Sequence, residues 1–252
     1  FTWSALWVAI ILSLVTLPIG ISLSYHRNLS HESFKLTKSL EYLFAYFGLH
    51  AVQGDSMYWV SVHRYHHQFT DTDRDPHTPI KGLWFSHLNW IFHHSHIKEK
   101  CGEQSNVMDL QKQAFYRFLG RTQSFHIGGL ALMLYVIGLP YLIWGMGVRV
   151  AVGHHITLAV NSVCHRWGKR PWETNDLSTK NWVMGILSHG EGWHNNHHAF
   201  EFSARLGLEW WQIDVPWYFV KLLEHLGLAN DVKVPTVFQK LKLRSYQTMY
   251  LW

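Results

Sequence analysis

The chain has few cysteines and few charged residues, and both shortages exclude whole classes of protein. Its 252 residues include two cysteines, Cys101 and Cys164, which cannot build a disulfide framework or a Cys-x-x-Cys metal site. Charged residues make up 15% of the chain, against about a quarter in soluble proteins. The net charge of +5 includes no basic run of the kind that binds nucleic acid. We therefore expect no nucleic-acid partner, a reducing compartment, and anionic lipid headgroups or an anionic acyl carrier as partners.

Long stretches without a charged side chain predict membrane-spanning helices. Residues 1–25 form one such stretch, and about 20 apolar residues suffice to cross a bilayer. A second block, residues 123–164, carries one charge at Arg149, and we expect Pro140 and the Gly-Met-Gly stretch at 145–147 to break it into two spans joined by a short turn. The 14 tryptophans suit the headgroup region of a membrane. The sequence thus predicts an all-α integral membrane protein with three spans.

The segments between the spans are expected to form a helical cap. Residues 44–54 lack charge but are too short to span, which predicts a re-entrant or interfacial helix. Basic residues follow the first span and flank the hairpin, so these ends face the cytosol under the positive-inside rule. Residues 55–120 and 166–252 would then form a cytosolic cap within one domain over residues 1–252. Because Phe1 already lies in an apolar segment, we expect the N-terminus and its targeting information to lie upstream.

Three compact histidine clusters stand on the predicted cytosolic side. They are His26-Arg-Asn-Leu-Ser-His31, His63-Arg-Tyr-His66-His67 and His194-Asn-Asn-His197-His198. Positions i, i+3 and i+4 of a helix share a face, so each of the last two clusters presents its imidazoles together. His26 and His31 are about 140° apart on an ideal α-helix and converge only if the helix ends or unwinds between them. Asn161 and His165, at the end of the last span, lie one turn apart.

Nine imidazoles and one amide are too many ligands for a single ion. A structural zinc site closes with four ligands and a catalytic one has three, whereas two ions could share this set and leave room for water or substrate. Imidazole suits iron, copper, nickel and zinc, so the ligand type alone does not choose the metal. The candidate metal ligands are His26, His31, His63, His66, His67, His165, His194, His197, His198 and Asn161.

The remaining histidines are expected to serve other roles. Ordinary surface or core positions are predicted for His50, His126, His154, His155 and His225, and support of the ligands for some of His77, His87, His93, His94 and His96. The segment Asp71-Thr-Asp73-Arg-Asp75 begins like a calcium-binding EF-hand loop, but Pro76 stands where the turn glycine belongs. We expect instead that Asp71 or Asp75 accepts a hydrogen bond from an imidazole of the second cluster.

These motifs resemble those of the integral-membrane fatty acyl desaturases, and the resemblance covers essentially the whole chain. The chain looks most like the plant Δ9-type acyl desaturases, relatives of the animal stearoyl-CoA desaturases. Besides the clusters, the matching motifs are Asp75-Pro-His77, Gly82-Leu-Trp-Phe-Ser-His87, Asn161-Ser-Val-Cys-His165 and Gly192-Trp-His-Asn-Asn-His-His-Ala-Phe200. The family normally has four transmembrane helices, so the resemblance implies that a partner of residues 1–25 lies upstream.

The resemblance implies a di-iron centre that uses O2 as co-substrate. One iron would be held by His26, His31, His63, His66 and His197, and the other by His67, His165, His194 and His198, with Asn161 holding a bound water. Iron fits because an unactivated C–H bond needs a metal that changes oxidation state. Two electrons would come from an external cytochrome b5 or ferredoxin. The implied reaction inserts a cis double bond, at Δ9 or Δ7, into a saturated C16 or C18 chain carried by CoA or a glycerolipid.

The resemblance also implies a bent apolar tunnel for the acyl chain. Gln53, Trp59 and Thr157 would line it, while Leu158 stands where the animal enzymes carry tryptophan. We expect the endoplasmic reticulum membrane, with a plastid membrane as the alternative, and an active site on the cytosolic or stromal face. A membrane di-iron hydroxylase is the nearest rival interpretation. A histidine-rich metal transporter is more remote, because most histidines lie beyond the ends of the spans.

Overall fold

The structure is a computed structural model that describes residues 2–102 and 104–244. The first half contains α1 (Trp3–Leu14), η1 (Val15–Ser30), β1 (Lys35–Leu36), α2 (Lys38–Leu49), α3 (Ser56–Phe69), α4 (Leu83–His87), α5 (His94–Cys101) and α6 (Met108–Gln111). The second half contains α7 (Ala114–Ile137), α8 (Leu139–Leu142), η5 (Ile143–Val148), α9 (Arg149–Val163), α10 (Trp182–Leu187), α11 (His194–Ala199), α12 (Val215–His225), β2 (Ala229–Asn230) and α13 (Val237–Leu243). The predicted helical class is confirmed; β1 and β2 pair antiparallel. Residues 245–252, the end of the predicted cap, lie outside the described residues.

The N-terminal helix carries the chain from one end of the molecule to the first histidine cluster. α1 continues directly into η1, a π-helix in which each turn takes one residue more than in an α-helix. Within the described residues, Trp3–Ser30 is the one segment long and apolar enough to cross a membrane by length and composition. The helix therefore extends beyond the predicted span of residues 1–25, passing through Pro18 and ending at Ser30.

α2 lies against η1 at very close range. A β-carbon added to Gly20 would lie 2.4 Å from the backbone nitrogen of Gly48, so only glycine permits this approach. The predicted re-entrant or interfacial helix over 44–54 is wrong in its limits, because the helix begins at Lys38 and ends at Leu49. The chain then turns into α3, whose first N–H groups are capped by the carboxylate of Asp55.

The block predicted to form a transmembrane hairpin is two helical arms, and the turn between them lies at a different position from the predicted one. The chain reverses at Gly138, whose φ of 153° is accessible to glycine, and α8, η5 and α9 then form one continuous helical arm. Pro140 falls in the first turn of that arm, where no helical N–H bond is lost. The Gly-Met-Gly stretch does not break the arm and lies in its π-helical segment. Arg149 is likewise inside the helix, and its guanidinium donates to Thr16 Oγ1 at 3.1 Å.

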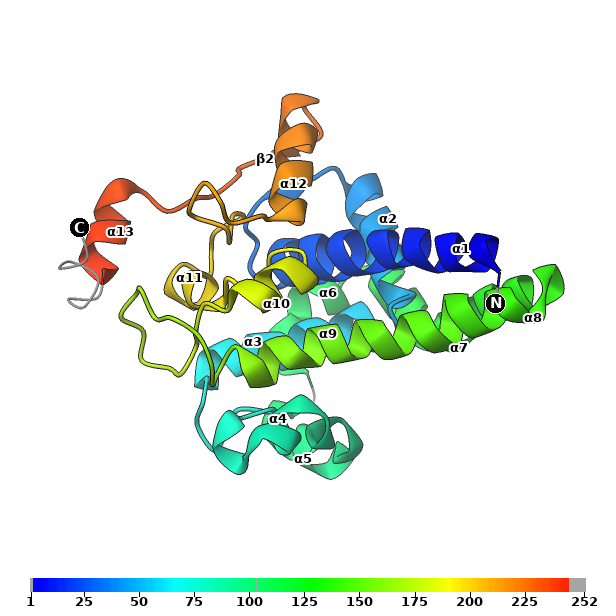
Figure 1. Ribbon diagram of the computed structural model, residues 1–252, viewed down its shortest axis with the longest axis horizontal. Helices are drawn as coiled ribbons and strands as arrows, with labels where there is room; N and C mark the ends of the chain where they lie inside the picture. Colours follow the sequence, from blue (N-terminus) through cyan, green and yellow to red (C-terminus); the bar gives the residue numbers. More distant parts are fainter. Residues whose placement is uncertain (1, 103, 245–252) are drawn as a thin grey trace.

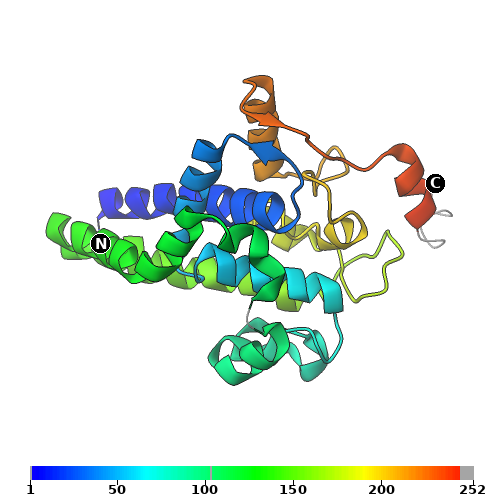
Figure 2. The same ribbon diagram turned by 180° about the vertical axis from the view of Figure 1, so that it is seen from behind.

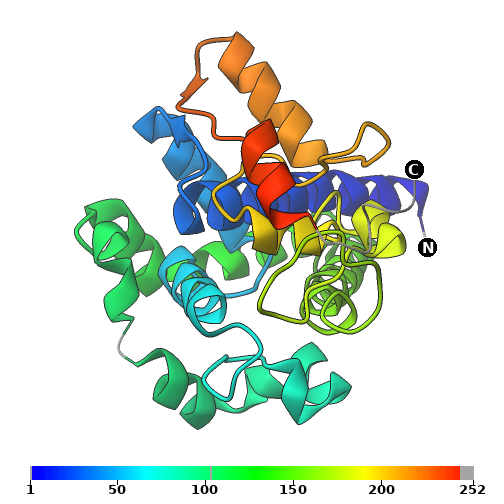
Figure 3. The ribbon, with the colours of Figure 1, turned by 90° about the vertical axis from the view of Figure 1, so that its left-hand side faces the viewer.

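The long helices lie alongside one another and lead to a cluster of shorter elements. Figures 1 and 2 show α1, α7 and the α8–α9 arm side by side, with the N-terminus near the turn between α7 and α8. At the other end, α3, α10 and α11 gather, and α4 and α5 lie along one side of the molecule, where α5 packs against α3 and α4 against α9 (Figure 3). Trp3, Trp7, Phe125 and Val136 expose large apolar surfaces on the long helices, as lipid-facing residues do. The number of spans and the side that the cap faces stay predictions.

Candidate metal centre

A π-helical turn brings the first two histidines together. The backbone N–H of His31 donates to the carbonyl of His26, five residues earlier, across 3.2 Å, as in a π-helix. In an α-helix the same two side chains would point about 140° apart. Here their ring centroids are 5.0 Å apart. The helix was predicted to end or unwind between these residues; instead it widens, and it ends at the residue before His31.

The nine predicted histidine ligands form two sets. Within each set, one ring nitrogen from every histidine lies within 4.8 Å of those of the others. The first set comprises His26, His31, His63, His67 and His197, and the second comprises His66, His165, His194 and His198. Both α3 and α11 contribute histidines to each set. The first set also contains His26 from η1 and His31, the residue after η1, and the second set also contains His165, which lies just after α9. All nine side chains converge at the end of the long helices, as the sequence predicts.

Carboxylates hold the outer ring nitrogen of five of these imidazoles. The contacts to Nδ1 are Glu191–His26 at 2.7 Å, Asp75–His66 at 3.0 Å, Glu201–His67 at 3.2 Å, Asp71–His165 at 3.0 Å and Asp176–His198 at 3.0 Å. An imidazole whose Nδ1–H donates to a carboxylate presents an unprotonated Nε2 on its other side, as metal-bound histidines usually do. The carboxylates thus fix both the tautomer and the direction of these rings.

Most of the imidazoles are held neutral. Burial, reinforced by the neighbouring imidazoles, lowers the pKa of His63, His194 and His197 well below the ordinary value. Burial and the nearby His66 also lower the pKa of His67 to about 4, although Glu201 opposes this. His66 differs, because Asp75 outweighs its burial and raises its pKa. Neutral imidazole is the form that binds metal, and an ion at the second set would displace any proton from His66.

The spacing of the inner nitrogens suits metal ions. Facing Nε2 atoms are separated by 2.8 to 3.0 Å in both sets, for example 3.0 Å between His26 and His197 and 2.9 Å between His165 and His194. Two nitrogens bound to one ion at right angles, by bonds of about 2.1 Å, lie about 3.0 Å apart. An all-imidazole set also favours a transition metal over calcium or magnesium. The residues therefore fit one transition-metal ion in each set.

Asparagines within the third cluster anchor α11. Asn195 Oδ1 accepts a hydrogen bond from the backbone N–H of Trp172 at 3.0 Å, and Asn196 Oδ1 accepts one from its indole at 2.7 Å. The amide group of Asn196 in turn donates to Gln212 and to the carbonyl of Leu206. Both asparagine side chains are buried, so the short helix is tied to two loops while its histidines face the metal sets.

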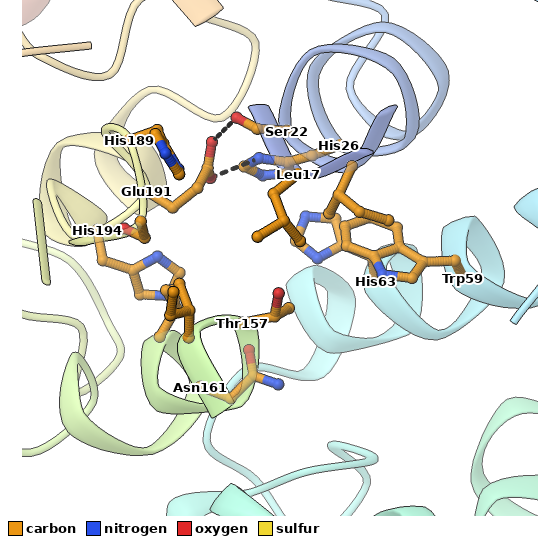
Figure 4. A pocket seen from close by; sticks show the side chains of 14 residues that line it. Leu17, Ser22, His26, Trp59, His63, Thr157, Asn161, His189, Glu191 and His194 are labelled. Atoms are coloured by element: carbon orange, nitrogen blue, oxygen red, sulfur yellow. Dashed lines mark hydrogen bonds and ion pairs between the residues drawn. The ribbon is translucent and has the colours of Figure 1, made fainter. Parts of the chain in front are cut away.

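Two cavities meet beside the histidine sets. The smaller, of about 60 Å³, is bounded by apolar residues such as Leu17 and touches both sets, through His26 and His63 of the first and His194 of the second. Figure 4 shows these side chains around the cavity. The larger, of about 360 Å³, lies between α3, α9 and the segment before α5. The two cavities share a wall made of Trp59, His63, Thr157 and Asn161.

The predicted substrate-lining residues form one hydrogen-bonded unit at this shared wall. Gln53 Nε2 donates to Thr157 Oγ1 at 2.9 Å, and Trp59 Nε1 donates to Gln53 Oε1 at 3.3 Å. The indole of Trp59 also stacks on the imidazole of His63, with centroids 5.0 Å apart. Asn161 lines both cavities.

Comparisons with known proteins agree with this geometry. A family model described as "Fatty acid desaturase" matches residues 1–229. The chain belongs to the fatty acid desaturase family. It is 57% identical over 244 residues to the acyl-CoA C20 Delta5-desaturase of Anemone leveillei, covering 96% of this chain and 78% of that protein.

Two relatives from Arabidopsis thaliana match as closely. The chain is 59% identical over 244 residues to the chloroplastic palmitoyl-monogalactosyldiacylglycerol delta-7 desaturase, covering 96% of this chain and 66% of that protein. It is 57% identical over 244 residues to Delta-9 acyl-lipid desaturase 1, covering 96% of this chain and 80% of that protein. Acyl desaturases are oxidoreductases of lipid metabolism, and this desaturase is therefore an oxidoreductase.

In the structure, the side chains of the second cluster group differently from the division that the resemblance implied. The resemblance implied that His66 joins the first set and His67 the second, but the desaturase has them the other way round. In an α-helix, residues four apart differ by about 40° and residues three apart by about 60° in the opposite direction. His63 and His67 therefore point together, and His66 diverges toward His165. The same rule holds in the third cluster, where His194 and His198 pair.

Asp71 or Asp75 was predicted to accept a hydrogen bond from an imidazole of the second cluster, and one of the two residues does so. Asp75 does contact a second-cluster imidazole, His66, whereas Asp71 contacts His165, which lies outside that cluster. Of the histidines expected to support the ligands, His77 packs on His66, with centroids 4.3 Å apart.

Sequence analysis missed three of the orienting carboxylates, Glu191, Glu201 and Asp176. Glu191 and Glu201 each lie three residues from the third cluster, a spacing that could have pointed to them. Asp176 lies in a loop with no such signal.

Proposed function

We propose that this desaturase uses two iron ions, one in each histidine set, and O2 to insert a cis double bond into a saturated C16 or C18 acyl chain. We place the bond at Δ9, with Δ7 as the alternative position. The observation that carries the proposal is the smaller cavity, which lies against both histidine sets and shares a wall with the larger one. An acyl chain that passes through the junction of the two cavities would present two adjacent methylenes to the metals. The named relatives include Delta-9, Delta-7 and Delta-5 desaturases.

The cavity walls support this chemistry because they give the substrate path a bend and an apolar lining. The bridge from Trp59 through Gln53 to Thr157 crosses the junction and would force an extended chain to bend there. Leu17 and Ile21 give the smaller cavity apolar walls that suit an acyl chain. Bound iron would supply the reduction of O2 to two waters, with two external electrons and two protons, while the acyl chain loses two hydrogens.

The partners follow from the same proposal. We infer that an external cytochrome b5 or ferredoxin donates the two electrons. The acyl carrier would be CoA or a glycerolipid, since the relatives' names include both kinds of substrate. We infer the endoplasmic reticulum membrane as the location, with a plastid membrane as the alternative, and a centre that faces the cytosol or stroma.

Lipid analysis in a host that lacks its own Δ9 desaturase tests the proposal. The protein is expressed from its complete reading frame, beside His67→Ala, and double bonds are located by mass spectrometry. A new monounsaturated acid that the variant does not make is the expected result, and its position decides between Δ9 and Δ7. A hydroxy acid in its place would assign the protein to the hydroxylases. No new product from an iron-loaded protein supplied with both donors would overturn the proposal.

A further inference from the structure

A polar opening leads from the molecular surface to the first histidine set. Its volume is about 360 Å³, and the residues that line it include His31, Arg64, His67, Gln68 and Glu201. His31 and His67 belong to the first set, whereas the lining, as far as the described residues show, includes no histidine of the second set. The opening thus reaches one metal set from the polar side, away from the cavities assigned to the acyl chain.

Glu201 is exposed to solvent, unlike the other orienting carboxylates. Its side chain is 59% exposed, compared with 16% for Glu191, 11% for Asp176 and 5% or less for Asp71 and Asp75. Its contact with His67 Nδ1, at 3.2 Å, is also the longest of the five. An exposed hydrogen bond breaks more readily than a buried one, because water can replace either partner. Among the five imidazoles that a carboxylate holds, His67 is therefore the one most easily released by a local change at the surface.

The charge in the opening favours a cation. Arg64 is neutralised by Asp109, at 2.9 Å, and its guanidinium also donates to the carbonyls of Leu29 and Asn106 at 2.7 Å each. These bonds fix the position of the guanidinium. The carboxylate of Glu201 supplies the negative charge beside the histidines, so a divalent cation meets an acceptor before it reaches the imidazoles.

We propose that this opening is the route by which metal ions reach and leave the first set, and that Glu201 is the positioning residue that closes the site by holding His67. The inference rests on the proposed metal centre and deepens it. Among the described residues, the smaller cavity reaches the second set through His194, but the polar opening does not reach this set. His66 and His165 are each 2% exposed, and the carboxylates that hold them, Asp75 and Asp71, are 5% exposed or less. The two sets should therefore exchange their ions at different rates.

Release of iron to a chelator measures these rates directly. The full chain in lipid nanodiscs is loaded with Fe(II) under anaerobic conditions and mixed with excess ferrozine, and the absorbance of the complex is followed. We expect two phases of equal amplitude with rates at least about tenfold apart. Glu201→Ala should accelerate the fast phase about 10- to 100-fold and leave the slow phase unchanged. Glu201→Gln keeps an acceptor oxygen and should restore most of the wild-type rate.

Three further variants separate the route from a general effect on folding. Gln68→Trp places a large side chain in the opening and should slow the fast phase several-fold. Asp176→Ala removes the partner of His198 and should accelerate the slow phase alone. Glu224→Ala removes a partly exposed carboxylate elsewhere, paired with Lys221, and should change neither rate.

The possible outcomes distinguish this inference from the proposed function. Two bound irons that leave at one common rate would overturn the route while leaving the metal centre intact. The same holds for a fast phase that responds to neither Glu201→Ala nor Gln68→Trp, because release would then occur through the acyl cavities. A chain that binds no iron would overturn the proposed metal centre, and this inference with it.

Discussion

The carboxylate of Asp75 accepts three hydrogen bonds where solvent does not reach. Oδ2 accepts from Nδ1 of His66 at 3.0 Å and from the backbone N–H of Asp71 at 2.9 Å, and Oδ1 accepts from the backbone N–H of His77 at 3.1 Å. Burial acts to raise the pKa of Asp75, but the nearby His66 and His77 lower it below its ordinary value. The group is therefore ionised throughout the neutral range. Asparagine has one acceptor oxygen, so in Asp75→Asn at least one donor faces an amide NH2.

Asp75→Asn should have two separate effects, one on the stability of the metal-free protein and one on its affinity for iron. If the amide oxygen turns toward His66 and Asp71, the N–H of His77 loses its partner, which costs about 1 to 3 kcal/mol of stability in the metal-free protein. A neutral acceptor also makes His66 a weaker ligand, so the affinity of the second set for iron should fall about 10-fold. The first set contains no ligand oriented by Asp75 and should keep its affinity.

Iron titration and thermal unfolding together test this reasoning. Iron bound per chain is measured at graded Fe(II) concentrations, and unfolding is followed in the metal-free protein. Asp73→Asn is the matched control, because Asp73 is exposed in the same loop. If Asp75→Asn binds both ions as tightly as the wild type and unfolds at the same temperature, the assignment of Asp75 is wrong. Equal loss of both ions would indicate a general structural role instead.

Three other perturbations follow from the same contacts. Gly20→Ala forces a β-carbon against the backbone of Gly48 and should destabilise the protein by about 1 to 3 kcal/mol in thermal unfolding. The control Gly128→Ala, with open space around it, should not destabilise the protein. Equal effects of the two substitutions would refute the close packing. Gln53→Ala removes the bridge at the cavity junction and should yield several double-bond positions by mass spectrometry without loss of iron; one unchanged product would contradict this role. The metal-free protein should lose stability as pH falls from about 6.5 toward 4, because unfolded histidines bind protons near 6.5 while the buried His67 does so only at about 4. A flat profile of unfolding free energy against pH would contradict that expectation.

The convergence of the histidines could be predicted because it depends on local periodicity. The spacing within the second and third clusters places each group on one helical face, and the structure has both on helices, α3 and α11. The first cluster shows the limit of this reasoning. Its five-residue spacing signalled a departure from the α-helix but did not decide between unwinding and widening. In the structure the widened helix η1 packs closely against α2 through Gly20 and Gly48. That contact joins distant parts of the chain and leaves no local pattern.

The turn of the hairpin was misplaced for a related reason. The Gly-Met-Gly stretch looks like a break because glycine favours turns, yet at Gly138 a single glycine makes the turn and Pro140 begins the next helix. Gly145 is buried, and a β-carbon there would lie 2.9 Å from the side chain of Leu134, so this glycine allows close packing instead. Composition alone does not separate a glycine that turns the chain from one that lets two helices touch.

The division of ligands between the sets has a consequence for how the centre works as a unit. α3 gives His63 and His67 to the first set and His66 to the second, and α11 gives His197 to the first and both other histidines to the second. Two helices, each one rigid element, thus fix the distance between the two sets. The carboxylates come instead from loops and from the segments that flank α11, and each orients one imidazole. Changes at a carboxylate should therefore weaken one ion at a time, whereas a shift of α3 or α11 should disturb both.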